Sequence, residues 1–451
     1  MADKILEEIA DYVLNFRDFS PEALQNARLA LFDSLACAMQ ALSFPECTKR
    51  LGPFFPETSI LRGCHVPGTS YCLDPFQATF NLGLMIRWLD YNDTWLAQEW
   101  GHPSDNFASI LMVAEWVNPD QKMRSVLEAA IQAYEIQGIL ALNFPFNRAG
   151  FDHVILVKIA SAALAVKLMG GDKKAMLAAL SHAFIDAGPL RAYRHAPNTG
   201  PRKSWAAGDA AARGVFLAER ALRGEPACPN ALSAPTWGVG DVFFHGHLPS
   251  LERPLGCYVM ENILFKVAFP AEFHAQTAVE AALQLHPSIK NKIETISEIT
   301  IDTHESALRI IDKTGPLSGP ADRDHCLQYM VACALLFGTL TAEHYEEAIA
   351  QDPRIDTLRK KMRVREYPPF SSDYLDPEKR SIANALQLFF NNGDISDKIT
   401  VEYPLGHRRR RHEALPHLEA KVKAAAPKGA LASYPTVDEL TVRDFLKMWL
   451  K

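Results

Sequence analysis

Between Glu7 and about Met260, apolar side chains recur at the three-and-four spacing of helices that bury one face. The spacing is clearest in PEALQNARLALFDSLACAM (21–39), MRSVLEAAIQAYEIQGILAL (123–142) and VILVKIASAALAVKLMG (154–170). The pair Gly170-Gly171 predicts the end of the third helix. An alanine-rich segment from Trp205, WAAGDAAARGVFLAERAL, predicts a helix whose small side chains let a neighbouring helix approach closely. No segment of this part alternates long enough to predict a strand.

The pattern changes after residue 262. The segment ISEITIDTH (296–304) alternates apolar and polar positions, which predicts a half-buried strand, and shorter strands are predicted at 362–367 and 385–390. The turn sequence Asn-Asn-Gly-Asp (391–394) then predicts a hairpin with the alternating segment 398–403. Helical stretches are expected at 324–337 and 342–350, and helical spacing returns from about residue 414.

These patterns together predict a mainly α protein with a smaller α+β domain. We expect a large all-helical domain formed from both chain ends, over residues 1–262 and 405–451. The α+β domain is inserted between them, over residues 263–404. A chain of 451 residues with 48% hydrophobic positions has room for two such cores.

Composition narrows the class of protein. No run of eighteen apolar residues occurs and the first residues lack the pattern of a signal peptide, so we expect no membrane association and a cytoplasmic location. Eight scattered cysteines without zinc-type spacing fit a reducing compartment and predict no metal ligands. A net charge of −6, with one short basic run at 408–411, predicts no nucleic-acid partner.

The densest group of polar residues lies between two apolar runs, 80–89 and 107–117. It comprises Asp90, Tyr91, Asn92, Asp93 and Thr94, followed by Glu99, His102, Ser104 and Asp105. If the first run is a helix that continues, Asp90 and Thr94 form an i,i+4 pair on one face, with Asp93 beside them.

His102 precedes Pro103, a residue favoured at the first helical position, so its imidazole is expected at a helix N-terminus. The helix dipole there disfavours imidazolium and favours a bound carboxylate, and a neutral histidine is a competent general base. The alternative is that Asp105 or Ser104 caps the helix and His102 is an ordinary loop residue.

Two further groups carry cations. The segment RAYRHAPNTGPRKSW (191–205) brings together Arg191, Arg194, His195, Arg202 and Lys203. It is either a solvated corner or a cradle for several carboxylates, in which Lys203 can stabilise the enolate-like charge formed when a proton leaves. Lys266 and His274 lie near the predicted domain boundary, a favoured place for small-molecule sites. His274 can equally be a satisfied histidine at a helix N-terminus.

The basic segment 406–413 (GHRRRRHE) is either a solvated loop or an additional anion or subunit contact. The sequence contains none of GxSxG, GxxxxGK[ST], GxGxxG or HExxH, and it lacks the close cysteine pair typical of an iron–sulfur cluster. We therefore expect acid–base chemistry without a cofactor.

Four blocks carry a resemblance to a known family. They are MIRWLDYNDTWLAQEWGHPSDN, YRHAPNTGPRKSWAAGDA, YVMENILFKVAFPAEFHAQTAVEAA and PADRDHCLQYM. Together they resemble the family of 2-methylcitrate dehydratase, cis-aconitate decarboxylase and iminodisuccinate epimerase, from about Ile5 to beyond Arg410. The resemblance implies the same two-domain division, a homodimer, and dehydration of 2-methylcitrate to 2-methyl-cis-aconitate in propionate breakdown, without an iron–sulfur cluster.

The resemblance also implies roles for individual residues. Four of them are expected to be catalytic: Asp90, Thr94, His102 and Lys203. Lys266 and His274 lie in a block whose spacing varies across the family. Because three carboxylates in one pocket need several cationic or donor groups, five residues are expected to bind a small tricarboxylic acid: Arg194, His195, Arg202, Lys266 and His274. Either His102 or Asp90 removes the proton next to a carboxylate, and a protonated partner donates to the departing hydroxyl.

Two alternative functions stay open: a cis-aconitate decarboxylase, and a carboxylate-binding relative without activity. The sequence departs from the family pattern in a shortened loop at 118–122, in Phe144-Pro145, and in the tail after Glu413.

Overall fold

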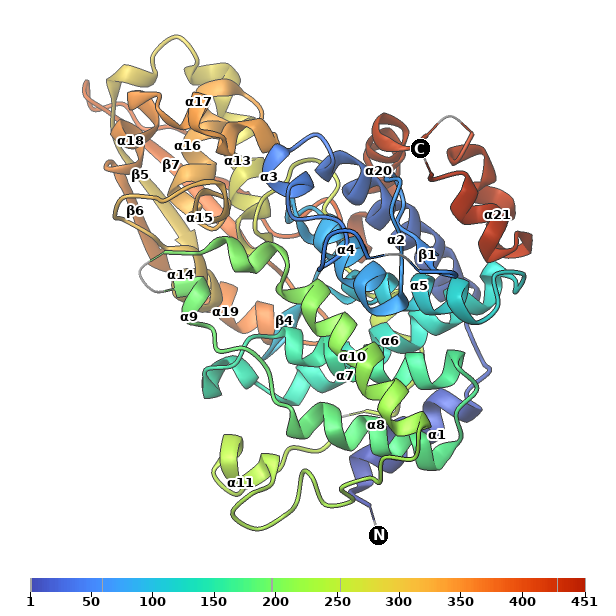
Figure 1. The fold of residues 1–451 in the computed structure, drawn as a ribbon. Coiled ribbons are helices and arrows are strands. Elements are labelled where there is room, and N and C mark those ends of the chain that lie inside the picture. Colours follow the sequence, from blue (N-terminus) through green and yellow to red (C-terminus); the bar gives the residue numbers. More distant parts are fainter. Residues whose placement is uncertain (1, 59, 196–197, 252, 428, 451) are drawn as a thin grey trace. The chain divides into compact units, whose positions relative to one another are not determined.

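The computed structural model describes residues 2–58, 60–195, 198–251, 253–427 and 429–450 (Figure 1). The chain divides into two compact units. The helical unit comprises Met1–Ala192, Ser204–Leu264 and Leu418–Lys451, and the α+β unit comprises Tyr193–Lys203 and Phe265–His417. The division falls after residues 264 and 417, where the sequence suggested 262 and 404, and it adds a short segment around residue 198 to the α+β unit. The expected fold class is confirmed.

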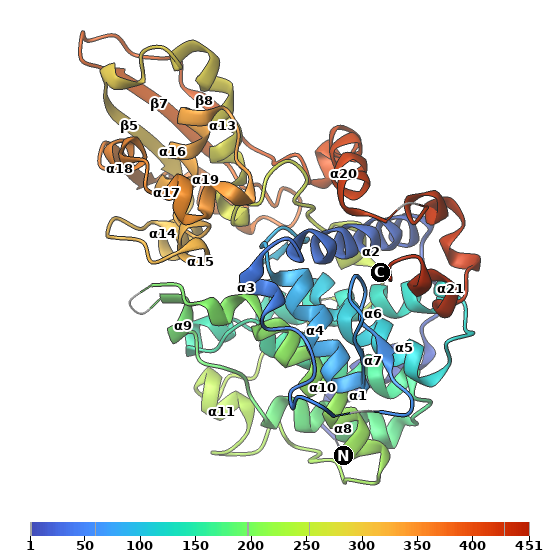
Figure 2. The same cartoon turned by 45° about the horizontal axis from the view of Figure 1, so that its top comes forward.

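Long helices build the helical unit. They are α1 (Lys4–Asn15), α2 (Pro21–Ala41), α4 (Pro75–Arg87), α5 (Phe107–Val117), α6 (Met123–Asn143), α7 (Val154–Leu168), α8 (Lys173–Ile185) and α10 (Ala206–Leu222), with the shorter α3 (Pro45–Thr48), α11 (Val239–Phe244), α12 (Tyr258–Glu261) and α21 (Val442–Lys447). The helix α7 is buried on all sides, from Val154 to Val166. It packs against α6, α8 and α10, while α2 packs against α4 and α6 (Figure 2).

The helical unit also contains strands that the sequence did not predict. They form two antiparallel pairs, β1 (Cys64–His65) with β2 (Cys72–Leu73), and β3 (Trp95–Leu96) with β4 (Trp100–Gly101). The expectation that this part of the chain contains no strand is therefore wrong. A strand of two residues is too short to produce a visible alternation of apolar and polar positions.

Small residues let α10 approach its neighbours, as the alanine-rich segment predicts. A Cβ atom on Gly208 would lie 2.6 Å from the carbonyl oxygen of Phe80 and 2.9 Å from the amide nitrogen of Leu84, both on α4. A Cβ atom on Gly214 would lie 2.8 Å from the carbonyl oxygen of Lys158 on α7. Since real Cβ contacts are longer, only glycine permits this spacing, and α10 thereby fixes the position of α4.

The α+β unit is built on a four-stranded sheet in the order β6-β5-β7-β8. Its strands are β5 (Ile296–Thr303), β6 (Met362–Glu366), β7 (Asn384–Phe390) and β8 (Ile399–Val401). The strand β5 pairs in parallel with β6 and antiparallel with β7, and Leu386 of β7 faces Ile399 of β8 in an antiparallel register. The predicted strands and the hairpin around Gly393, whose φ is 88°, are confirmed.

Helices complete this unit. They are α13 (Gln276–Ile289), α14 (Glu305–Ile311), α15 (Pro320–Arg323), α16 (Leu327–Phe337), α17 (Glu347–Ala350), α18 (Pro353–Arg359) and α19 (Pro368–Leu375), with the 3-10 turns η4 (Phe273–Ala275), η5 (Ile293–Thr295), η6 (Ala342–Tyr345) and η7 (Arg408–Arg410). The helix α13 packs on β7, β8 and α16. Three elements cross the unit limits: α9 (Ala192–His195), η3 (Pro201–Ser204) and α20 (Arg411–Ala425). In the described part of the chain, no helix combines the length and apolar character needed to cross a bilayer.

Candidate active site

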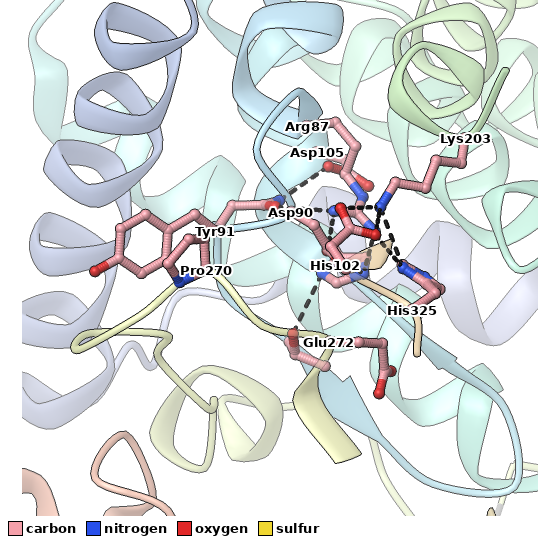
Figure 3. A network of polar contacts seen from close by, with 12 residues as sticks. Arg87, Asp90, Tyr91, His102, Asp105, Lys203, Pro270, Glu272 and His325 are labelled. Carbon is pink, nitrogen blue, oxygen red and sulfur yellow. Dashed lines mark hydrogen bonds and ion pairs between the residues drawn. The ribbon is translucent and has the colours of Figure 1, made fainter. Parts of the chain in front are cut away.

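Three charged or ionisable side chains meet in the helical unit (Figure 3). Arg87 is the last residue of α4, and its guanidinium forms an ion pair with Asp90, three residues later. Its Nη2 lies 2.7 Å from Nε2 of His102, and that nitrogen lies 3.8 Å from Oδ1 of Asp90. Thr94 completes the group, with its Oγ1 3.3 Å from Nδ1 of His102. All four side chains are buried. The structure thus brings Asp90, Thr94 and His102 together, as expected.

The local backbone differs from the expected one. The helix α4 ends at Arg87, and Asp90 has a φ of 49°, in the left-handed region. Asp90 and Thr94 are therefore not an i,i+4 pair on a helix, and that expectation is wrong. Aspartate tolerates this conformation better than most residues, and the turn redirects its carboxylate towards Arg87.

The contacts of His102 define its protonation pattern. Nδ1 lies 2.7 Å from the backbone carbonyl oxygen of Asp93. Because a carbonyl only accepts, Nδ1 carries a hydrogen, so in the neutral ring Nε2 holds the lone pair and accepts from Arg87. The geometry therefore holds a neutral imidazole with its basic nitrogen directed at the guanidinium.

The helix entry at Pro103 is where the sequence placed it. His102 is the N-cap residue of η1 (Pro103–Asn106), which leads into α5. The capping oxygen comes from Asp93, whose Oδ1 accepts the backbone N–H of Ser104 at 3.1 Å. Ser104 and Asp105 instead accept from Nδ2 of Asn92, at 2.9 and 3.1 Å. The alternative in which one of them caps the helix is thereby resolved in favour of Asp93.

Asp93 is a supporting group of this site. It is fully buried, and Tyr134 donates its hydroxyl to Oδ2 at 2.6 Å. Burial raises the pKa of Asp93 to about 6, against the lowering effect of the hydrogen bonds from Ser104 and Tyr134. The same residue therefore caps η1 with its side chain and orients His102 with its backbone.

Sequence reasoning missed two residues here. Arg87 ends an apolar run, and its spacing of three from Asp90 is the only local signal that pointed to it. His153 is buried, with its ring centroid 5.7 Å from that of His102, and it lies 3.4 Å from Asp152. No spacing in the sequence connects His153 to His102.

A second constellation lies within the α+β unit. Nζ of Lys203 is 2.6 and 2.5 Å from the two carboxylate oxygens of Asp324. Nδ1 of His325 is 2.7 Å from Oδ1 of Asp324 and 3.2 Å from Nζ of Lys203, and Figure 3 shows Lys203 and His325 directed towards each other. Two residues earlier, Asp322 accepts the backbone N–H of Thr199 at 3.1 Å. The segment 320–325 therefore holds the described part of the loop before Lys203. This segment belongs to a block that carries the resemblance, but no role was expected for its two aspartates or for His325.

The expected carboxylate-binding residues have different surroundings within the α+β unit. Lys266 and His274 are fully buried. Nδ1 of His274 is 2.8 Å from Oε1 of Glu272, and Nε2 is 3.2 Å from the hydroxyl of Tyr374. Burial alone would raise the pKa of Glu272, but the charge and hydrogen bond of His274, with His325 and Lys266, lower it to about 2. Both ring nitrogens of His274 thus have partners at the start of η4, as the alternative of a satisfied histidine requires, and its carboxylate-binding role stays a prediction.

Two of the three remaining expected residues lie over the ring of Tyr193. The guanidinium carbons of Arg194 and Arg202 lie 5.3 and 5.6 Å from the centroid of its ring. Arg194 is buried, Arg202 is half-buried and His195 is exposed. Whether these cations form a carboxylate cradle stays a prediction, and part of the same loop, residues 196–197, lies outside the described residues. In the basic segment 406–413, Arg410 forms ion pairs with Glu280 and Glu413.

Comparisons with known proteins agree with the sequence resemblance. Residues 7–252 match the model of the MmgE/PrpD N-terminal domain, and residues 269–434 match that of the MmgE/PrpD C-terminal domain. The chain is 53% identical to a 2-methylcitrate dehydratase of Escherichia coli strain K12 and 54% identical to one of Cupriavidus necator, each over 93% of this chain and 89% of the relative. It is 47% identical to a mitochondrial 2-methylcitrate dehydratase of Yarrowia lipolytica, over 100% of this chain and 90% of the relative.

Proposed function

Since the chain belongs to the MmgE/PrpD family, we propose that it is a 2-methylcitrate dehydratase, a hydro-lyase of propionate breakdown that forms 2-methyl-cis-aconitate. More than half of its residues are identical to bacterial enzymes of that name over nearly the whole chain. The arrangement of Arg87, Asp90 and His102 is the structural observation that supports this chemistry, because eliminating water requires a base that takes a proton from carbon.

We assign the proton transfer to His102. Its Nε2 takes the proton from the carbon next to a carboxylate, the electron pair of that bond forms the double bond, and the carbon–oxygen bond breaks. The imidazolium then gives the proton to the departing oxygen, which leaves as water. The ion pair with Arg87 holds Asp90 as a carboxylate 3.8 Å from Nε2, where it stabilises the imidazolium that forms between these steps.

The other expected roles are proposals that rest on the resemblance. Thr94 is assigned to holding the ring of His102, and Lys203 to stabilising charge on a substrate carboxylate. Arg194, His195, Arg202, Lys266 and His274 are assigned to the carboxylates of a tricarboxylic acid. The pairing of Lys203 with Asp324 supports its role, because a lysine held between a carboxylate and a histidine is a charged group of fixed position.

Two variants test the assignment. Replacing His102 by Ala or Asp90 by Asn should lower kcat by roughly 100- to 10,000-fold, the usual contribution of an acid–base group. Turnover is followed by the ultraviolet absorbance of the unsaturated product, and a thermal melt shows that each variant is folded. Near-normal turnover in both variants would refute the assignment.

The same assay separates the alternative functions. Carbon dioxide released from cis-aconitate, without dehydration of 2-methylcitrate, would identify a decarboxylase. Thermal stabilisation by 2-methylcitrate without product would identify a relative that binds but does not turn over. We expect dehydration to persist after treatment with a chelator, because the spacing of the eight cysteines is unsuited to an iron–sulfur cluster.

The homodimer and the cytoplasmic location also remain proposals. Light scattering of the purified chain tests the first, with twice the chain mass of 50.2 kDa expected. Cell fractionation tests the second, and the Yarrowia lipolytica relative, described as mitochondrial, gives the competing outcome.

A further inference from the structure

A buried ion pair between Lys421 and Asp33 contacts Tyr91, the residue that follows Asp90. Lys421 lies on the part of α20 that belongs to the helical unit, and its Nζ is 2.6 Å from Oδ1 of Asp33 on α2. The same ammonium donates to the backbone carbonyl oxygen of Tyr91 at 2.6 Å and lies 3.7 Å from the centroid of its ring. The side chains of Lys421 and Asp33 are 2% and 1% exposed, so the pair is shielded from water.

Such a pair contributes little net stability to a fold. Removing a lysine and an aspartate from water costs several kcal/mol for each ion, and apolar residues of similar size often serve stability as well or better. Burial lowers the pKa of Lys421, but the charge of Asp33, with smaller effects of Cys37 and Tyr91, outweighs it and raises the pKa. The lysine is therefore charged, and its ammonium is held between the carboxylate of Asp33 and the carbonyl oxygen of Tyr91.

The backbone that it contacts is a strained turn. Asp90 has a φ of 49°, a conformation that costs a non-glycine residue on the order of 1 kcal/mol. The turn persists only if its neighbours hold it. On its C-terminal side, Thr94 exchanges two backbone hydrogen bonds with Leu264, at 2.8 and 3.1 Å. Directly after Asp90, the carbonyl oxygen of Tyr91 accepts a hydrogen bond from Lys421.

We propose that Lys421 and Asp33 are positioning residues that hold the turn at Asp90 in the conformation needed for dehydration. Lys421 acts through the Tyr91 carbonyl, 330 positions earlier in the chain, and is not itself a catalytic residue. The C-terminal segment therefore serves the chemistry although it carries none of the expected catalytic residues. This inference rests on the proposed function for its kinetic readout, but a second readout is independent of activity.

Replacing Lys421 by Met removes the donor to Tyr91. We expect kcat to fall roughly 100-fold, as for other small misplacements of catalytic groups, with a smaller change in KM. The pH profile of kcat/KM should shift, because the distance from the Asp90 carboxylate to His102 changes. Lys421→Arg, which keeps a cationic donor, should recover part of the activity.

A matched control separates positioning from stability. Lys158 is also a buried lysine of the helical unit, paired at 3.3 Å with Asp186 and donating to the backbone carbonyl of Ala187, a residue with a φ of 43°. Lys158→Met should lower the melting temperature and leave kcat near the wild-type value. The double variant Asp33→Leu with Lys421→Met should recover stability relative to Lys421→Met alone, yet keep the low kcat.

Hydrogen exchange gives the readout that needs no activity. The amide hydrogens of peptides covering residues 88–96 should exchange at least about tenfold faster in Lys421→Met and in Asp33→Asn than in the wild type. In Lys158→Met their exchange rates should equal those of the wild type. Wild-type kcat in folded Lys421→Met, normal activity in the double variant, or unchanged exchange over 88–96 would each overturn the proposal. A wild-type protein that does not dehydrate 2-methylcitrate would refute the proposed function alone, and the exchange rates would still decide this inference.

Discussion

Glu99 gives the folded chain a dependence on pH that a single substitution should remove. The side chain is fully buried at the turn between β3 and β4, where it accepts the backbone N–H of Asn147 at 2.6 Å and its side-chain amide at 3.0 Å. Burial raises the pKa of Glu99 from 4.5 to about 7, against the lowering influence of Arg191 and Asn147. The sequence had placed Glu99 with Asp90 and His102, but its carboxylate accepts from Asn147 and from the backbone N–H of Trp100.

The size and sign of the effect follow from that pKa. Below pH 4.5 the folded and unfolded states are both protonated at Glu99. Between pH 4.5 and 7 the unfolded chain releases the proton while the folded chain retains it, so the free energy of unfolding falls. At roughly 1.4 kcal/mol for each tenfold change in proton affinity, the total loss is about 3 kcal/mol and is complete above pH 7.

Replacing Glu99 by Gln removes the ionisation and keeps an oxygen that accepts from Asn147. Urea unfolding at pH 5, 6, 7 and 8 measures the effect. We expect the stability of the variant, relative to the wild type, to rise by about 2.5 kcal/mol from pH 5 to pH 8, because part of the loss has already occurred at pH 5. Glu22→Gln, on the exposed face of α2, is the control and should leave the slope unchanged. Parallel curves for the wild type and Glu99→Gln would refute the reasoning.

Three further predictions test other parts of the structure. Gly208→Ala should lower the free energy of unfolding by roughly 1–3 kcal/mol in a urea titration, because the new methyl group meets the backbone of α4, whereas Gly315→Ala, with open space around it, should not. Glu272, with its pKa lowered to about 2, stabilises the fold above pH 4.5, and this contribution to the free energy of unfolding should disappear as the pH falls towards 2. In Glu272→Gln the free energy of unfolding should therefore fall less between pH 4.5 and pH 2, and a fall equal to that of the wild type would contradict the prediction. Lys203→Met and Asp324→Asn should each lower kcat. The kcat of the double variant should be no lower than that of the more impaired single variant, because the two residues act as a pair. Additive decreases in kcat would show that they act independently.

The elements that could be predicted from the sequence are those in which one face is buried along its whole length. The expected helix at 123–142 corresponds to α6, and the strand at 296–304 corresponds to β5, because periodic burial leaves a periodic pattern of apolar residues. The hairpin at Gly393 was predictable for a different reason, since a positive φ favours glycine at that position. In these cases the information is local.

The end of α4 could not be predicted in the same way. Leu89 is buried like the helix before it, so the apolar run gives no sign that the helix stops at Arg87. The turn at Asp90 depends on Lys421 and Leu264, which are distant in the sequence. The sequence could therefore indicate which residues gather around His102, but the conformation that brings them into contact is set by tertiary hydrogen bonds.

Roles were harder to predict than positions because a buried charge takes its role from its partner. The sequence shows Asp90 as an acid close to Asp93, whereas in the structure the ion pair with Arg87 favours its carboxylate form. Lys203 reads as one of several cations in a loop, whereas Asp324 holds it at a defined position. Since desolvation makes an unpaired buried charge costly, neutralising one member of such a pair also changes the state of the other. A single substitution at these residues therefore reports on a pair, and the roles can be separated only by substituting both members together.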